Sequence, residues 1–107
     1  MKRILDLQKQ CDELSSLICS FCKPLMLSVE FRSQVRQLLS SEADLRLTIE
    51  LAMEVETSKE MKEKITLAKE EAEIILYTLS LMDDSKIGEL KPMKAMTTTI
   101  IKEIESL

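Results

Sequence analysis

Residues 2–23 read KRILDLQKQCDELSSLICSFCK, and the positions of the apolar side chains in this stretch decide the fold. These side chains recur at alternating steps of three and four residues, which places them on one face of an α-helix. Pro24 follows directly; it cannot donate a backbone hydrogen bond, and it disfavours helical geometry at the preceding residue. We therefore expect an amphipathic helix over residues 2–23, with an apolar stripe of Ile4, Leu7, Cys11, Leu14, Ile18, Phe21 and, beyond the helix, Leu25.

The segment after this helix predicts a connector and then a second helix. Residues 24–27 form the connector, and Ser28 has a hydroxyl suited to the N-cap of a helix that extends to about Val55. The apolar spacing is again helical. The expected buried stripe of this second helix is Phe31, Val35, Leu38, Leu45, Ile49 and Ala52.

A third stripe does not continue the phase of the second, which indicates a turn between two helices. Thr57 and Glu60 have the spacing of a capping box, so a helix that starts near Ser58 explains both observations. The alternative is one uninterrupted helix over residues 28–82, because no Gly or Pro lies within that range. The third stripe is Met61, Ile65, Ala68, Ala72, Ile75, Leu79 and Met82.

The last part of the chain predicts a loop and a fourth helix. Asp83, Asp84, Ser85 and Gly88 suggest a polar loop, and Pro92 suits the first turn of a final helix. One face of that helix carries Met93, Met96, Ile100, Ile104 and Leu107. Four helices with short connections predict an all-α fold, an antiparallel up-down four-helix bundle.

Length and composition agree with a single bundle domain over residues 1–107. The chain has one Gly, two Pro and three aromatic residues, which leaves little material for hairpin turns or strands. Hydrophobic residues make up 45% and charged residues 32%, so a chain of this length can bury a modest core.

The same composition removes most enzyme chemistry. The chain has no histidine, which excludes Ser-His-Asp and Cys-His catalysis and His-ligated metal sites. Its single Gly excludes glycine-rich phosphate loops. We therefore expect no enzyme activity, no cofactor and no catalytic residue.

Three cysteines raise the question of thiol chemistry. Cys19 and Cys22 form a C-x-x-C motif, which exchanges disulfides or binds metal in other contexts. Here the motif falls near the end of an amphipathic helix, where the helix dipole raises a thiol pKa instead of lowering it. We expect small apolar packing residues at Cys11, Cys19 and Cys22 and no metal site, with redox activity and zinc binding left as minor alternatives.

Charge and hydropathy describe the expected compartment and partners. The net charge is −4, which gives no overall attraction to nucleic acid or to an anionic membrane. Asp6 interrupts any apolar signal-peptide core, and no later stretch has the length of a membrane span. An odd number of cysteines without a secretory signal fits a reducing compartment. We expect a cytoplasmic protein without membrane contact.

Glu42 occupies a stripe position between Leu38 and Leu45 where an apolar residue is expected. A buried carboxylate needs a partner, and Arg46 or Arg36 can supply one, unless the carboxylate reaches a subunit interface. The alternatives are that Glu42 is a ligand-site residue or is simply exposed.

Two groups of residues are candidates for contacts with other molecules. A second apolar row on the second helix predicts self-association, and a local group of arginines gives an alternative, nucleic-acid binding. The interface candidates are Leu39, Glu42, Leu47, Leu51 and Val55, and the nucleic-acid candidates are Arg32, Arg36 and Arg46.

Several short stretches resemble a known family. They are Ser33-Gln34-Val35-Arg36-Gln37, Ser41, and Thr57-Ser58-Lys59-Glu60-Met61 followed by Ile65 and Ala68. This layout resembles the four-helix-bundle proteins encoded in intervening sequences of bacterial large ribosomal RNA genes, whose relatives include an accessory protein of diversity-generating retroelements. The resemblance implies a non-enzymatic bundle that assembles into a ring of five subunits. In some relatives a basic surface meets nucleic acid or a reverse transcriptase.

Together these observations predict a non-catalytic helical bundle that forms a homo-oligomer and acts as a protein-interaction or accessory module. The expected partners are further copies of the chain, with a pentamer as the size that the resemblance implies, and a second protein. Nucleic-acid binding through the arginines remains the alternative.

Overall fold

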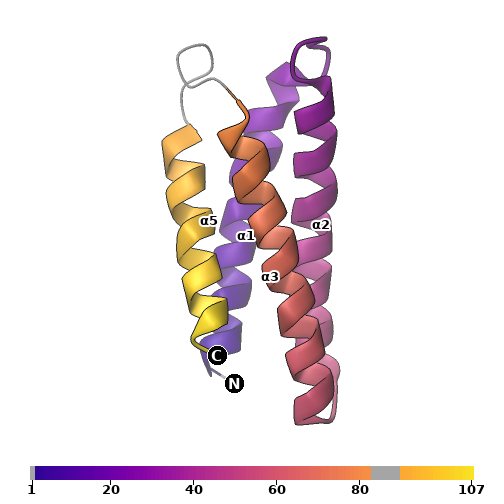
Figure 1. Ribbon diagram of the computed structural model, residues 1–107, viewed down its shortest axis with the longest axis vertical. Helices are drawn as coiled ribbons and strands as arrows, with labels where there is room; N and C mark the ends of the chain where they lie inside the picture. Colours follow the sequence, from indigo (N-terminus) through magenta and orange to yellow (C-terminus); the bar gives the residue numbers. More distant parts are fainter. Residues whose placement is uncertain (1, 83–89) are drawn as a thin grey trace.

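The computed structural model describes residues 2–82 and 90–107, and this part of the chain is all-helical. The elements are α1 (Lys2–Cys22), a short 3-10 helix η1 (Lys23–Leu25), α2 (Arg32–Glu54), α3 (Ser58–Ser80) and α5 (Leu90–Glu105). Figure 1 shows the four α-helices side by side in an elongated body of 44 × 20 × 18 Å. Helix α1 packs against α2 and α5, and α3 packs against the same two helices, as in a helical bundle.

The expected boundary of the first helix is close to the observed one. Helix α1 ends at Cys22, one residue before the predicted end, and Pro24 lies inside η1. The predicted start of the second helix at Ser28 is wrong, because α2 begins only at Arg32. The Ser28 hydroxyl accepts a hydrogen bond from the Phe31 amide at 3.3 Å, but this closes a single turn that does not continue into α2.

The turn between α2 and α3 excludes the uninterrupted helix. Val55 and Thr57 both have extended backbones, with ψ of 152° and 151°. The Thr57 hydroxyl accepts a hydrogen bond from the Glu60 amide at 3.1 Å, which is the N-cap that the sequence predicts. Helix α3 ends at Ser80, two residues before the predicted Met82. The predicted polar loop of Asp83, Asp84, Ser85 and Gly88 lies outside the described residues.

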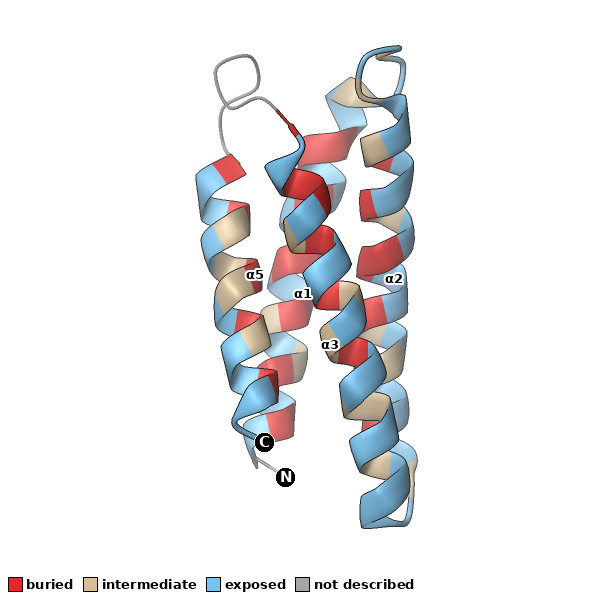
Figure 2. Ribbon diagram, viewed as in Figure 1, coloured by how far each residue is buried: buried red, intermediate tan, exposed pale blue. Residues whose placement is uncertain are grey.

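The core is one cluster of buried side chains from all four α-helices, and Figure 2 shows the buried positions on their inward faces. The predicted stripes supply most of it, and every predicted stripe residue within α1 is buried. Pro92 lies in the first turn of α5, as predicted. Leu107 is half-exposed because α5 ends before it. The Lys69 ammonium on α3 lies 3.1 Å from the Glu105 carboxylate and adds an ion pair between α3 and α5.

No helix within the described ranges combines the length and the apolar character that crossing a membrane requires.

Candidate functional site

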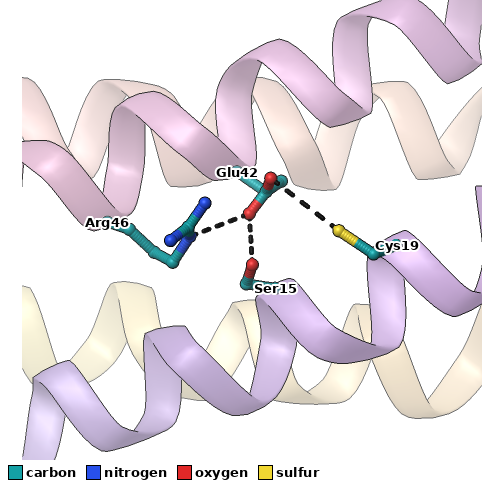
Figure 3. Close-up of polar contacts among 4 residues, drawn as sticks. All are labelled: Ser15, Cys19, Glu42 and Arg46. Carbon is teal, nitrogen blue, oxygen red and sulfur yellow. Dashed lines mark hydrogen bonds and ion pairs between the residues drawn. The ribbon is translucent and has the colours of Figure 1, made fainter.

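The most concentrated polar chemistry lies around Glu42, between α1 and α2 (Figure 3). The Glu42 residue is only 6% exposed. The Ser15 hydroxyl of α1 donates a hydrogen bond to Glu42 Oε2, and Arg46 Nε donates to the same oxygen at 3.0 Å. The Cys19 Sγ lies 3.9 Å from Oε1. The carboxylate therefore has partners from both helices, as a buried carboxylate requires.

The ion pair is buried on one side and open on the other. The Arg46 side chain is about two-fifths exposed, whereas the Glu42 side chain is almost fully covered. The hydrogen bond and the charge of Glu42 raise the pKa of Arg46 above its usual value. Of the two arginines proposed as partners from the sequence, Arg46 is the one that forms this pair.

The cysteines have very different environments. Cys11 and Cys22 are buried, whereas Cys19 is exposed, and all three are free thiols. Burial raises the pKa of Cys11 to about 12, with a smaller contribution from Asp12. Burial, Cys19 and Glu42 raise the pKa of Cys22 to about 11. Both thiols are therefore protonated at neutral pH. For Cys22, the member of the C-x-x-C motif among them, this is the opposite of what a nucleophile needs.

Within the part of the chain that the structure describes, no group of three or more Cys, Asp or Glu side chains is arranged to hold a metal ion. The polar cluster of Ser15, Cys19, Glu42 and Arg46 is instead closed by its own hydrogen bonds. Its geometry suits a link that fixes how α1 sits against α2.

The five interface candidates do not lie on one face. Glu42 is inside, Leu39 packs against the edge of the core, and Val55 is half-buried in the turn after α2. Leu47 is 53% exposed and Leu51 is also exposed. Within this group, the outward-facing residues are therefore Leu47 and Leu51.

Helix α3 adds exposed apolar residues that the sequence reasoning missed. Leu67, Ile74 and Leu81 are exposed and are spaced seven residues apart, so they share one face of the helix. That sevenfold spacing was the signal that could have found them.

Leu47 and Leu67 lie at similar distances along the chain from the turn between α2 and α3, whereas Leu51 lies nearer to that turn and Ile74 lies farther from it. The Ser41 hydroxyl bonds to the Glu71 carboxyl across the two helices, and burial raises the pKa of Glu71 above its usual value despite this bond. Leu47 lies seven residues before the end of α2, and Leu67 lies nine residues after the start of α3. We name the residues Leu47, Leu51, Leu67 and Ile74 the α2–α3 outer surface.

The three arginine candidates also differ in role. Arg32 and Arg36 are exposed in the first two turns of α2. Arg46 is held by Glu42. The structure therefore leaves two exposed arginines near one end of α2, and the third belongs to the internal cluster.

A groove of about 710 Å³ lies between the start of α3 and the end of α5. Its apolar lining includes Met61 and Ile65, which are partly exposed, and Ile104, which is buried. Among the described residues, two buried side-chain oxygens lack a hydrogen-bond partner, and they belong to Gln10 and Gln34. Neither residue lines this groove, so no unpaired polar group indicates a ligand there.

The comparisons with known proteins add no assignment: no protein-family model, no curated protein and no solved structure matches the chain.

Proposed function

We propose that this chain is a non-catalytic, antiparallel up-down four-helix bundle that works by self-association, as a protein-interaction or accessory module. The observation that carries the proposal is the α2–α3 outer surface, where four large aliphatic side chains are exposed on two adjacent helices. Single exposed apolar residues are normal, but several of them on two helices that pack against each other suggest an interface.

The internal chemistry supports the same proposal. The cluster around Glu42 uses its hydrogen-bonding capacity within the chain, so it fits a structural link better than a reactive site. The resemblance to the bundle proteins of ribosomal intervening sequences favours a ring of five subunits. Free thiols fit a cytoplasmic location, where thiols stay reduced.

The test is the native mass of the reduced protein, measured by size exclusion with light scattering at micromolar concentration and at two salt concentrations. We expect a closed oligomer, and a pentamer would support the family resemblance. Leu47→Glu should lower the mass toward that of the monomer, because it places a charge in an apolar contact. Leu5→Glu is the matched control, because Leu5 is 47% exposed but lies on α1.

Two results would contradict the proposal. A stable monomer at the highest soluble concentration would remove self-association as the function. An oligomer that survives Leu47→Glu but is lost in Leu5→Glu would move the interface from the α2–α3 outer surface to α1.

A second candidate is nucleic-acid binding, because Arg32 and Arg36 are both exposed near the start of α2. Arginines contact phosphates, and such binding weakens steeply with salt. The test is binding to single-stranded RNA and duplex DNA at low salt, with Arg36→Glu as the variant. Salt-sensitive binding that Arg36→Glu abolishes would support this candidate, and the absence of binding at low salt would remove it.

A further inference from the structure

The connector between α1 and α2 exposes its apolar side chains to an unusual degree. Met26, Leu27 and Val29 are 57%, 95% and 81% exposed. We name these three residues the apolar tip. The neighbouring Leu25 and Phe31 pack against the core, so they already serve the folding of this connector. Leu27 and Val29 therefore contribute little to packing within the described chain, and Met26 is only partly covered.

The connector is held in shape by its own hydrogen bonds. The Ser28 amide donates to the Leu25 carbonyl at 3.0 Å, and the Phe31 amide donates to the Ser28 hydroxyl. Figure 1 places this connector at one end of the long body, opposite the end where N and C lie. Figure 2 shows the same connector mostly in the colour of exposed residues. The apolar tip thus projects from an end of the bundle on an ordered turn.

Its size and shape limit what can cover it. The apolar tip consists of three exposed residues. A standard protein interface uses about 20 to 30 residues on each partner. A second copy of the chain therefore finds too little area here for a stable end-to-end contact. A lipid surface needs no matching shape, because acyl chains adapt to the inserted side chains.

The charges around the apolar tip fit anionic lipid headgroups. Lys23, Arg32 and Arg36 are exposed beside it, against Glu30 on the connector itself. Residues 23–36 therefore carry three basic side chains against one carboxylate, a local positive charge in a chain whose net charge is −4.

We infer that the apolar tip inserts into the surface of an anionic lipid membrane, with Lys23, Arg32 and Arg36 facing the headgroup phosphates. Apolar residues flanked by basic ones are typical of proteins that lie on one leaflet without spanning it. This inference concerns contact with one membrane surface only, and it departs from the sequence-based expectation of no membrane contact. It is independent of the proposed self-association, which uses the sides of α2 and α3.

The test is sedimentation of the whole chain with vesicles of phosphatidylcholine alone and with vesicles that also contain phosphatidylserine. We expect binding to the anionic vesicles and much weaker binding to the neutral ones. The double variant Leu27→Asp, Val29→Asp should weaken the binding at least about tenfold, and Arg32→Ala about fivefold. Leu5→Asp, at the other end of the bundle, should bind as the unaltered protein does. Unchanged helical circular dichroism shows that each variant is folded.

Four outcomes would overturn the inference. The first two are a failure of the unaltered protein to sediment with anionic vesicles, and binding of the double variant that is as strong as that of the unaltered protein. Equal binding to both vesicle types would remove the role of the basic residues. Loss of an oligomer in the double variant, without vesicle binding by the unaltered protein, would assign the apolar tip to a second copy instead.

Discussion

The inward face of α2 buries a charged side chain, whereas its outward face exposes apolar side chains. The inward face buries Leu45 and Ile49 together with the carboxylate of Glu42, and the chain itself supplies partners for that carboxylate. The outward face exposes Leu47 and Leu51. A buried charge without partners prevents folding, whereas exposed leucines cost little in a monomer. The difference indicates that the polar groups of the core are paired within the chain, and that a contact with another molecule would use the outward face of α2.

The largest expected effect is a difference in the free energy of unfolding between substitutions on the inward and outward faces of α2. Leu45→Ala should lower the free energy of unfolding by about 3 kcal/mol, because it opens a cavity at a fully buried position. Leu47→Ala, the matched control two residues away, should change it by less than about 0.5 kcal/mol in the monomer. Urea denaturation at low protein concentration measures both values.

A large loss of stability in Leu47→Ala would break the comparison between the faces. It would mean that Leu47 is covered in solution even at low concentration. If the loss grew with protein concentration, the covering molecule would be another copy of the chain, because only an association depends on concentration in this way.

The second prediction concerns the polar group on the inward face. Glu42→Gln keeps the size of the side chain but removes the charge that faces Arg46 and Ser15, and we expect a loss of about 2 kcal/mol. The estimate lies below that for a fully buried pair, because Arg46 is partly exposed and water can solvate it. Glu54→Gln at the exposed end of α2 is the control. A Glu42→Gln variant as stable as the unaltered protein would show that the cluster only fills space.

Periodicity was enough to predict most of the fold. The stripe in residues 2–23 is buried throughout α1, and the change of stripe phase near Thr57 correctly indicates a turn with a threonine cap. The start of α2 was wrong for a physical reason. A serine hydroxyl that accepts a hydrogen bond from the amide three residues later is found both at helix N-caps and in isolated turns. The sequence alone does not distinguish these two cases.

The candidate site was predictable only where its contacts are local. Glu42 and Arg46 are four residues apart on one helix, so their pairing follows from helical spacing. The contacts of Glu42 with Ser15 and Cys19 depend on how α1 is positioned against α2, and the sequence pattern does not fix that position. The exposure of Met26, Leu27 and Val29 was missed because apolar residues in a connector are equally compatible with packing onto the core, as Leu25 does.

The smallest expected effect is a pH dependence of stability caused by the two buried thiols of α1, Cys11 and Cys22. The folded protein keeps the Cys11 thiol protonated up to about pH 12 and the Cys22 thiol up to about pH 11, whereas an unperturbed thiol has a pKa of 9.0. Below pH 9 both the folded and unfolded chains hold these protons, so stability does not depend on them. Above pH 9 the unfolded chain releases protons that the folded chain retains, so stability falls as pH rises.

Each buried thiol should therefore remove at most about 1.4 kcal/mol of stability per pH unit above pH 9. Urea denaturation of the reduced protein between pH 7 and pH 10 measures this slope. Cys11→Ala should have a lower stability at pH 7, because it loses packing, but a shallower fall above pH 9, because one of the two buried thiols is gone. Lysine titration is common to both proteins, so the difference between their slopes isolates Cys11. Equal slopes would show that Cys11 ionises as easily in the folded chain as in the unfolded one, which requires water to reach the inward face of α1.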